Sequence, residues 1–134
     1  MNAKKFRSHT KKIAGLFRNL GQPARLRILM SIGEGEACVC HLEALLGYRQ
    51  AYISQHLMAL RKDGLLSSRR DGRFIFYRIK DPAILGLIGE AGQIMGIKDD
   101  SLNDLTHTDA RPQCCCPNCA AETDASLISE ALIP

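Results

Sequence analysis

The spacing of apolar residues changes along this chain, and the change limits the folds that the chain can adopt. Up to residue 62, apolar residues recur at intervals of three and four positions, as they do on one face of a helix. Between residues 65 and 79 they follow the alternating period of strands, with Asp71-Gly72 in the middle. An Asp-Gly pair between two strand-like segments is a strong signal for a tight hairpin. The sequence therefore predicts helices followed by one β-hairpin.

Five helices are expected around the hairpin. Pro23 opens the second of them, because proline fits the first turn of a helix. Glycines follow the ends of the first three helices, and Asp63-Gly64 ends the fourth. The predicted fold class is mainly α with a small two-stranded β-hairpin. The expected helices cover about residues 5–19, 23–32, 39–46, 50–62 and 83–95, and the expected strands cover residues 65–70 and 73–79.

The periodic pattern fades at about residue 99 and divides the chain in two. A chain of 134 residues is long enough for one domain with one core. We therefore expect a folded domain over residues 1–98 and a flexible, cysteine-containing C-terminal tail over residues 99–134. No apolar run approaches the roughly 20 residues of a membrane helix, and the basic N-terminus lacks the apolar segment of a signal peptide. These features predict a cytoplasmic protein with no membrane partner.

Positive charge is concentrated in the first 80 residues. They hold sixteen Lys and Arg against five Asp and Glu, whereas residues 81–134 hold two against nine, which leaves the net charge of +4. A basic segment of this kind suits a polyanionic partner such as double-stranded DNA. A solvated basic surface is the alternative, and charge alone does not exclude it. The helix-turn-helix pattern within this basic segment favours DNA.

The short third helix, a tight turn, the fourth helix and the basic hairpin follow one another in the order of a winged helix-turn-helix. In this arrangement the second helix of the pair enters the major groove, where glutamine can pair with adenine and arginine with guanine. The hairpin arginines would contact phosphates or the minor groove, which disfavours the alternative of a winged helix used for protein contacts. His56 is interpreted as structural, because it lies beside the inward-facing Leu57. The expected DNA contacts are Arg49, Gln50, Tyr52, Ser54 and Gln55 on the helix, and Arg69, Arg70 and Arg73 on the hairpin.

The fifth helix carries an apolar face that is wide for a terminal helix with little sequence left to cover it. We interpret this face as part of a homodimer surface, and the alternative is packing against its own domain. The residues of the face are Ile84, Leu87, Ile88, Ala91 and Met95.

Six cysteines form two groups, one before the third helix and one in the tail. A reducing compartment disfavours three structural disulfides, so metal or redox chemistry is the better interpretation. Three thiolates suit As(III) or Sb(III), and four suit Zn(II) or Cd(II). The alternatives are small buried apolar residues in the first group and an oxidation-prone segment in the second. The groups are Cys38 and Cys40, and Cys114, Cys115, Cys116 and Cys119.

Cys38 and Cys40 are two positions apart at the start of the third helix. On an ideal helix such residues point about 200° apart, so they could not hold one ion while both are helical. Chelation is therefore expected to bend or unwind the start of this helix. The strain would displace the adjoining fourth helix, with Gln50, Tyr52 and Gln55, from the DNA groove.

Five local strings carry a family resemblance, and they are Pro23–Leu29, Cys38–Leu42, Ile53–Leu57, Leu60–Leu66 and Arg69–Tyr77. As a set they resemble the ArsR/SmtB family of metal-sensing repressors over about residues 10–97. The resemblance implies a homodimer joined through the first and last helices, which binds an operator without metal and leaves it when metal binds. Cys38-Val39-Cys40 resembles the family's metal-binding segment, and the tail cluster resembles the C-terminal cysteine triads of some arsenic-responsive members.

The chain departs from the family pattern at its candidate metal ligands. Family arsenic sensors often carry a further cysteine three residues after Cys40, where this chain has Glu43. Cadmium and lead sensors of the family add N-terminal cysteines, which residues 1–37 lack. A third thiolate would therefore come from the tail or from the other subunit. The family site on the last helix, built from histidine and carboxylate ligands, is excluded because that helix has no histidine.

These observations lead to one functional hypothesis and two alternatives. The hypothesis is a dimeric transcriptional repressor, not an enzyme, that releases its operator when cysteine thiolates bind a thiophilic ion. The ion would be As(III), Sb(III), Cd(II), Pb(II) or Zn(II). The alternatives are a repressor that senses redox state through its thiols and a metal-buffering protein without regulatory coupling. The sequence shows no nucleophile–base pair and no phosphate-binding loop.

Overall fold

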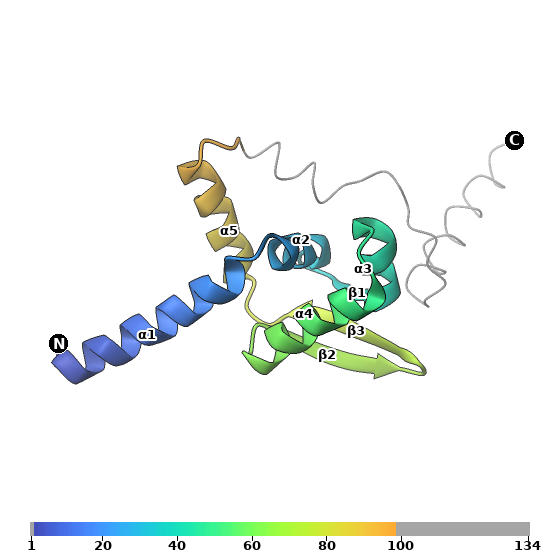
Figure 1. Cartoon of the computed structure of the whole chain (residues 1–134), viewed down its shortest axis with the longest axis horizontal. Coiled ribbons are helices and arrows are strands. Elements are labelled where there is room, and N and C mark those ends of the chain that lie inside the picture. The colour runs from blue at the N-terminus through green and yellow to red at the C-terminus, as the bar shows by residue number, and fades with distance from the viewer. Residues whose placement is uncertain (1, 99–134) are drawn as a thin grey trace, which may run out of the picture.

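The computed structural model describes residues 2–98, which fold into five helices and one antiparallel sheet (Figure 1). The expected tail, residues 99–134, lies outside the described residues. The order of helices and hairpin is the predicted one. The helices are α1 (Ala3–Leu20), α2 (Pro23–Ile32), α3 (Val39–Leu46), α4 (Gln50–Lys62) and α5 (Ala83–Ile94), and the strands are β1 (Glu36–Cys38), β2 (Leu66–Asp71) and β3 (Phe74–Ile79).

Local capping explains where the helices begin and end. α1 begins slightly earlier than expected, because the side chain of Asn2 accepts a hydrogen bond of 3.1 Å from the backbone N–H of Lys4. α2 begins at Pro23, as expected. α3 ends at Gly47, whose φ of 71° is left-handed and whose backbone N–H bonds the carbonyl of Glu43. Gly47 thus ends α3 three residues before α4 begins at Gln50.

The hairpin predicted around Asp71-Gly72 is present, and a third strand is added to it. β3 lies in the middle of the sheet and pairs with both β1 and β2 in antiparallel fashion. The sequence does not predict β1, because its three residues are too few to show an alternating pattern. In the register of the sheet, Cys38 stands opposite Phe76, and Phe76 stands opposite Arg69. The first cysteine of the candidate metal site therefore belongs to the sheet.

The core lies between the inner face of the sheet and the helices. Tyr77 of β3 faces this core, whereas Phe76 packs in a separate cluster with Cys38, as the alternation along the strand predicts. Ile53 and Leu57 of α4 have no exposed surface. Since α4 is fixed through its apolar face, its polar face is left at the surface of the molecule.

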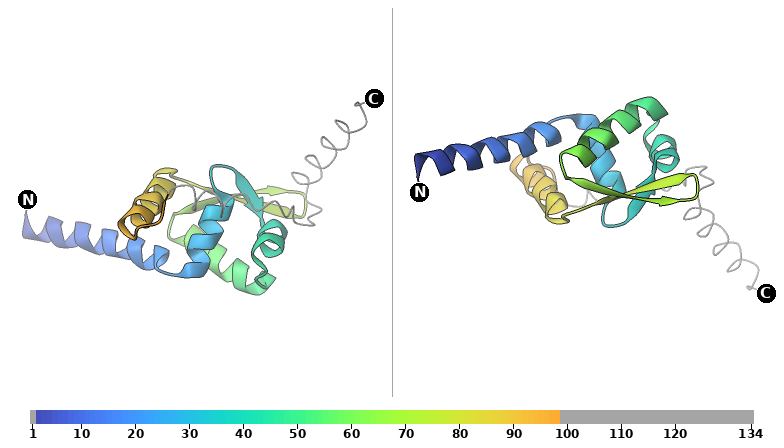
Figure 2. Two further views of the ribbon diagram at one scale, coloured as in Figure 1. Left: turned by 90° about the horizontal axis from the view of Figure 1, so that it is seen from above. Right: turned by 90° about the horizontal axis from the view of Figure 1, so that it is seen from below.

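α1 differs from the other helices because it projects away from the rest of the molecule (Figure 1 and Figure 2). Its C-terminal end packs on the core through Leu20, which is buried, and Leu16. Residues 2–14 are all exposed. α5 packs against α2 at the same end of the molecule. Of the helices described, none has the length and hydropathy needed to cross a bilayer.

Candidate nucleic-acid interface and thiol site

The side of α4 that faces away from the core carries the residues predicted to contact DNA. Gln50 and Gln55 are exposed, and Ser54 is half-buried. Tyr52 is 44% exposed. Arg49, at the cap of α4, is exposed as well. The packing of α4 therefore leaves all five of these side chains accessible to a ligand at the surface.

Tyr52, on the exposed side of α4, is held in place by contacts with two neighbouring rings. The ring of Tyr52 meets those of Tyr48 and His56 edge to face, with centroid distances of 5.3 Å and 4.6 Å. The hydroxyl group of Tyr48 accepts a hydrogen bond of 3.2 Å from Arg27 of α2. Tyr52 is therefore held by the turn before α4 and, through Tyr48, by α2.

His56 joins α4 to α2 and α1. Nε of Arg25 donates a hydrogen bond of 3.1 Å to Nδ1 of His56, and Nη1 of Arg25 donates one of 2.5 Å to Oδ1 of Asn19. Burial lowers the pKa of His56 from its usual 6.5, and the charge of Arg25 lowers this pKa further. The other ring nitrogen, Nε2, is buried and has no hydrogen-bond partner among the described residues. His56 is thus structural, as predicted, whereas sequence reasoning misses Arg25, which stands 31 positions away.

The three arginines of the hairpin do not share one environment. Arg70 and Arg73 are exposed on either side of the turn. Arg69 donates two hydrogen bonds to the carboxylate of Glu36, one of 2.9 Å from Nε and one from Nη2. Its guanidinium carbon lies 4.5 Å from the centroid of the Phe76 ring, and the bond to Glu36 raises the pKa of Arg69. Arg69 is therefore engaged within the sheet, and Arg70 and Arg73 are better placed to meet DNA.

Cys38 and Cys40 lie at the junction of β1 and α3. Cys38 is the N-cap of α3, with an extended backbone (φ −88°, ψ 167°), and its Sγ accepts a hydrogen bond of 3.4 Å from the N–H of His41. Cys38 is 2% exposed and Cys40 is half-buried. Their Sγ atoms are 3.1 Å apart. Only Cys40 is helical, so the two sulfurs lie close together while α3 is intact, and the expectation that α3 must unwind loses its basis.

A groove of about 450 Å³ joins the two cysteines to the elements predicted to contact DNA. Its lining comes from the start of α3, the exposed side of α4 and the hairpin. Cys38, Cys40, Gln50, Ser54 and Arg73 all line it. A ligand held by the thiols would therefore lie beside side chains from both α4 and the wing, which is the hairpin formed by β2 and β3.

The described part of the chain supplies two thiols to a thiophilic ion. Among residues 2–98, no three Cys, His, Asp or Glu side chains gather closely enough to hold a metal ion. Soft ions prefer thiolates, and tetrahedral sites take four ligands, so Cys38 and Cys40 fit part of such a site. The other predicted ligands lie outside the described residues, and they are Cys114, Cys115, Cys116 and Cys119.

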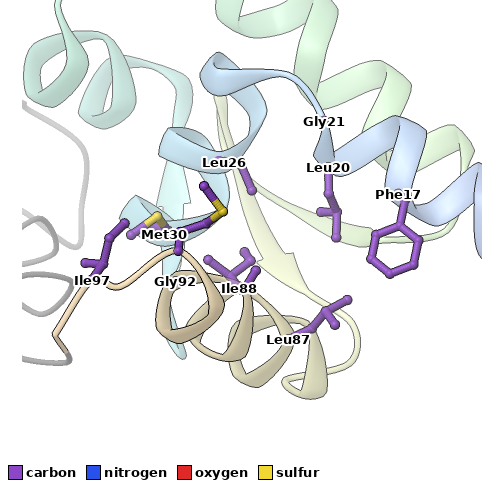
Figure 3. A pocket seen from close by; sticks show the side chains of 11 residues that line it. Phe17, Leu20, Gly21, Leu26, Met30, Leu87, Ile88, Gly92 and Ile97 are labelled. Carbon is purple, nitrogen blue, oxygen red and sulfur yellow. The ribbon is translucent and has the colours of Figure 1, made fainter.

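A second, apolar groove of about 350 Å³ lies between α1, α2 and α5. Figure 3 shows Phe17 and Leu20 of α1 on one side of it and Leu87 and Ile88 of α5 on the other. Of the five residues predicted at the dimer surface, Ile84 is the exception. It is 7% exposed and packs in the core of its own domain, so its assignment to the dimer surface is wrong. The other four, which line the groove, are Leu87, Ile88, Ala91 and Met95.

Comparison with known proteins identifies the segment that runs from α2 through α4 to the start of β2. The model of the family described as bacterial regulatory protein, arsR family, matches residues 22–68. The biofilm growth-associated repressor of Agrobacterium fabrum is 39% identical over 77 residues, which are 58% of this chain and 66% of that protein. The arsenic resistance transcriptional regulator ArsR2 of Pseudomonas putida is 34% identical over 104 residues, which are 72% of this chain and 89% of that protein.

Solved structures share the fold. NolR from Sinorhizobium fredii superposes with a TM-score of 0.64 at 31% identity, over 73% of this chain and 97% of that one. The transcriptional repressor BigR from Xylella fastidiosa gives 0.61 at 31% identity, over 70% of this chain and 96% of that one. These similarities confirm the predicted winged helix-turn-helix and indicate a DNA-binding regulator rather than an enzyme. The chain therefore belongs to the arsR family of bacterial regulatory proteins.

Proposed function

We propose that this protein is a cytoplasmic, dimeric repressor that releases its operator when Cys38 and Cys40 bind a thiophilic ion. The position of the two thiols is the observation that carries the proposal. Their Sγ atoms are 3.1 Å apart, and they line the same groove as Gln50 and Ser54 of α4. A bound ion would lie beside side chains proposed to read DNA. The ion would favour the released state to the extent that it binds this state more tightly.

The proposed DNA contacts divide between base edges and phosphates. α4 would lie in the major groove, where Gln50 and Gln55 can pair with adenine and Arg49 with guanine. Tyr52 and Ser54 would add contacts along the same face. Arg70 and Arg73 of the wing would contact phosphates or the minor groove. We assign Arg69 to the support of the wing, because Glu36 and Phe76 already hold its guanidinium group.

A second copy of the chain is the proposed partner of α1 and α5. Phe6 is 61% exposed, Phe17 is 55% exposed and Met95 is 77% exposed, although all three are apolar. A dimer joined through these helices would cover the apolar groove. It would also present two copies of α4 to two half-sites on DNA.

The relatives support a thiophilic ion without identifying it. Two of them are named for resistance to arsenic and to cadmium, whereas another is named for nodulation. The candidate ions are As(III), Sb(III), Cd(II), Pb(II) and Zn(II). We propose that a third thiolate comes from the second subunit or from the tail, where the candidates are Cys114, Cys115, Cys116 and Cys119.

One titration tests the proposal. The reduced full-length chain, bound to a DNA fragment that it has selected in vitro, is titrated with each candidate ion under strong reductant, and release is followed by fluorescence anisotropy. At least one ion should release the wild-type protein. Cys38→Ser and Cys40→Ser should each keep DNA binding and lose release. Release of the double variant at wild-type ion concentrations would move the sensor away from α3, and ion binding without any release would indicate metal buffering.

Truncation after Asp109 tests the contribution of the tail, because it removes four of the six cysteines. If a tail thiolate completes the site, the shortened protein should bind DNA normally and need much more ion for release. If the shortened protein responds at wild-type concentrations, the response site is confined to residues 1–109.

A thiol redox sensor is the second candidate, and the 3.1 Å separation of the Sγ atoms favours it. Hydrogen peroxide would oxidise the two thiols to a disulfide, taking two electrons and two protons and becoming two molecules of water. DNA release by peroxide that dithiothreitol reverses, together with no response to any ion, would establish this function in place of metal sensing.

A further inference from the structure

We infer that the ion pair between Glu36 and Arg69 transmits the state of the thiol site to the wing, an inference that rests on the proposed function. β1 makes the link possible. Glu36 is the first residue of this three-residue strand and Cys38 is the last. The two side chains alternate with Ala37, so they lie on the same face of the sheet. A movement of Cys38 is therefore also a movement of Glu36.

A packed row crosses this face of the sheet. Cys38 of β1 pairs with Phe76 of β3, and Phe76 pairs with Arg69 of β2. Phe76 is 1% exposed and packs against Cys38. The guanidinium carbon of Arg69 lies 4.5 Å from the centroid of the Phe76 ring. The sulfur, the aromatic ring and the guanidinium group thus follow one another from the first outer strand to the second.

Glu36 and Arg69 form an ion pair that spans the middle strand, β3. Their two hydrogen bonds, one of which is 2.9 Å long, join β1 to β2 directly, although in the strand order β1-β3-β2 each of these strands pairs with β3. A carboxylate and a guanidinium group that share two bonds fix direction as well as distance. The pair therefore resists a shift of β1 relative to the hairpin.

The row ends where the wing begins. Arg70 follows Arg69 on β2, and Arg73 stands across the hairpin turn. An ion inserted between the sulfurs of Cys38 and Cys40, which lie 3.1 Å apart without it, would displace Cys38 and with it β1, and Arg69 would follow Glu36. This displacement would move the wing arginines relative to α4. Because exposed ion pairs contribute little to stability, this role in coupling can be separated from folding.

The test compares Glu36→Gln, Arg69→Gln and the double variant in the full-length chain. The matched control is Lys80→Gln, because Lys80 is exposed, lies just after β3 and does not line the pocket that holds the pair. For each protein, DNA affinity is measured with and without As(III) and, separately, Cd(II). Ion binding is measured independently through thiolate charge-transfer absorbance. Hydrogen exchange of the wing amides, residues 69–74, gives a readout without any ion.

Each single variant should bind the ion as the wild type does, yet lose about tenfold of the ion-dependent change in DNA affinity. The double variant should lose no more than either single one, because the same link is removed. Wing amides should exchange faster in Glu36→Gln, and Lys80→Gln should resemble the wild type. Wild-type coupling and wild-type exchange in both single variants would overturn the inference. If no ion releases even the wild-type protein, the proposed function fails instead.

Discussion

The helix-turn-helix with its sheet and the pair of terminal helices differ in where their apolar side chains lie. Leu57 of α4 has no exposed surface, and Phe76 of the sheet is 1% exposed. Phe17 of α1, by contrast, is 55% exposed, and Ile94 of α5 is 83% exposed. The first region completes its core within one chain, whereas the second leaves apolar surface that another chain can cover.

This difference separates the consequences of substitutions in the two regions. The side chains proposed to contact DNA stand on elements that are packed before DNA arrives, so changes there should affect folding or DNA contact. Changes on α1 and α5 should affect assembly and leave the helix-turn-helix intact.

The largest effect is expected in the core. Leu57→Ala should lower the free energy of unfolding by about 2–5 kcal/mol, because it removes a fully buried side chain and leaves a cavity. The neighbouring Met58 is 67% exposed, so Met58→Ala should change stability by less than about 0.5 kcal/mol. Urea unfolding followed by circular dichroism measures both. Equal stability losses would show that α4 is not anchored as described.

A charge in the apolar groove should prevent assembly through α1 and α5 and leave the helix-turn-helix folded. Leu87→Glu would bury an unpaired carboxylate in a dimer, at a cost of about several kcal/mol, so the variant should run as a monomer in light scattering. Ala83→Glu places the same charge on an exposed position of α5, outside the groove, and should leave the mass unchanged. A dimeric Leu87→Glu variant with native circular dichroism would place the interface elsewhere.

The wing prediction concerns DNA contact without assembly. Arg73→Ala should weaken binding to all DNA sequences and reduce the slope of log affinity against log salt by about 1 per protomer, since one phosphate contact is lost. Gln55→Ala should instead change sequence preference. Lys98→Ala removes one exposed positive charge after the end of α5, outside α4 and the wing, and serves as the control for net charge. An unchanged salt slope in Arg73→Ala would remove the wing from the interface.

The smallest effect is expected from pH. The pKa of His56 lies below 6.5 in the folded protein, so on acidification the unfolded chain takes up a proton first. The contribution of His56 to stability is therefore present above about pH 6.5 and is lost as the pH falls toward the lower, folded pKa. Thermal unfolding at pH 7.5 and 5.5 should show a smaller difference in His56→Gln than in the wild type. A larger difference in the variant would contradict this assignment.

Features that depend on neighbouring residues could be predicted from the sequence. The bounds of α3 and α4 follow from a helical period closed by glycine, and the hairpin follows from Asp71-Gly72. Contacts between distant residues could not be predicted in this way. The partners in the Arg25–His56 and Arg69–Glu36 pairs are 31 and 33 positions apart, and no local pattern reports such a pairing.

Two expectations near the candidate sites fail because a local pattern does not give the surroundings of a single side chain. The helical stripe of α5 shows that Ile84 faces apolar surroundings, but not that those surroundings are its own core. The argument that chelation bends α3 applies helix geometry to both cysteines, but Cys38 is the N-cap residue before α3, where its sulfur lies beside that of Cys40. Periodicity locates an element within a residue or two, which is coarser than the geometry of a two-thiol site.

In the proposed dimer, the apolar groove between α1 and α5 would also make the amount of assembled repressor depend on the total amount of protein. In the proposed dimer the groove is filled only by a second copy, so mass action governs how much assembled protein exists. Well below the dissociation constant of the dimer, halving the total concentration would reduce the assembled species about fourfold. Dilution by cell growth would therefore weaken repression on its own, before any inducer reached the thiols.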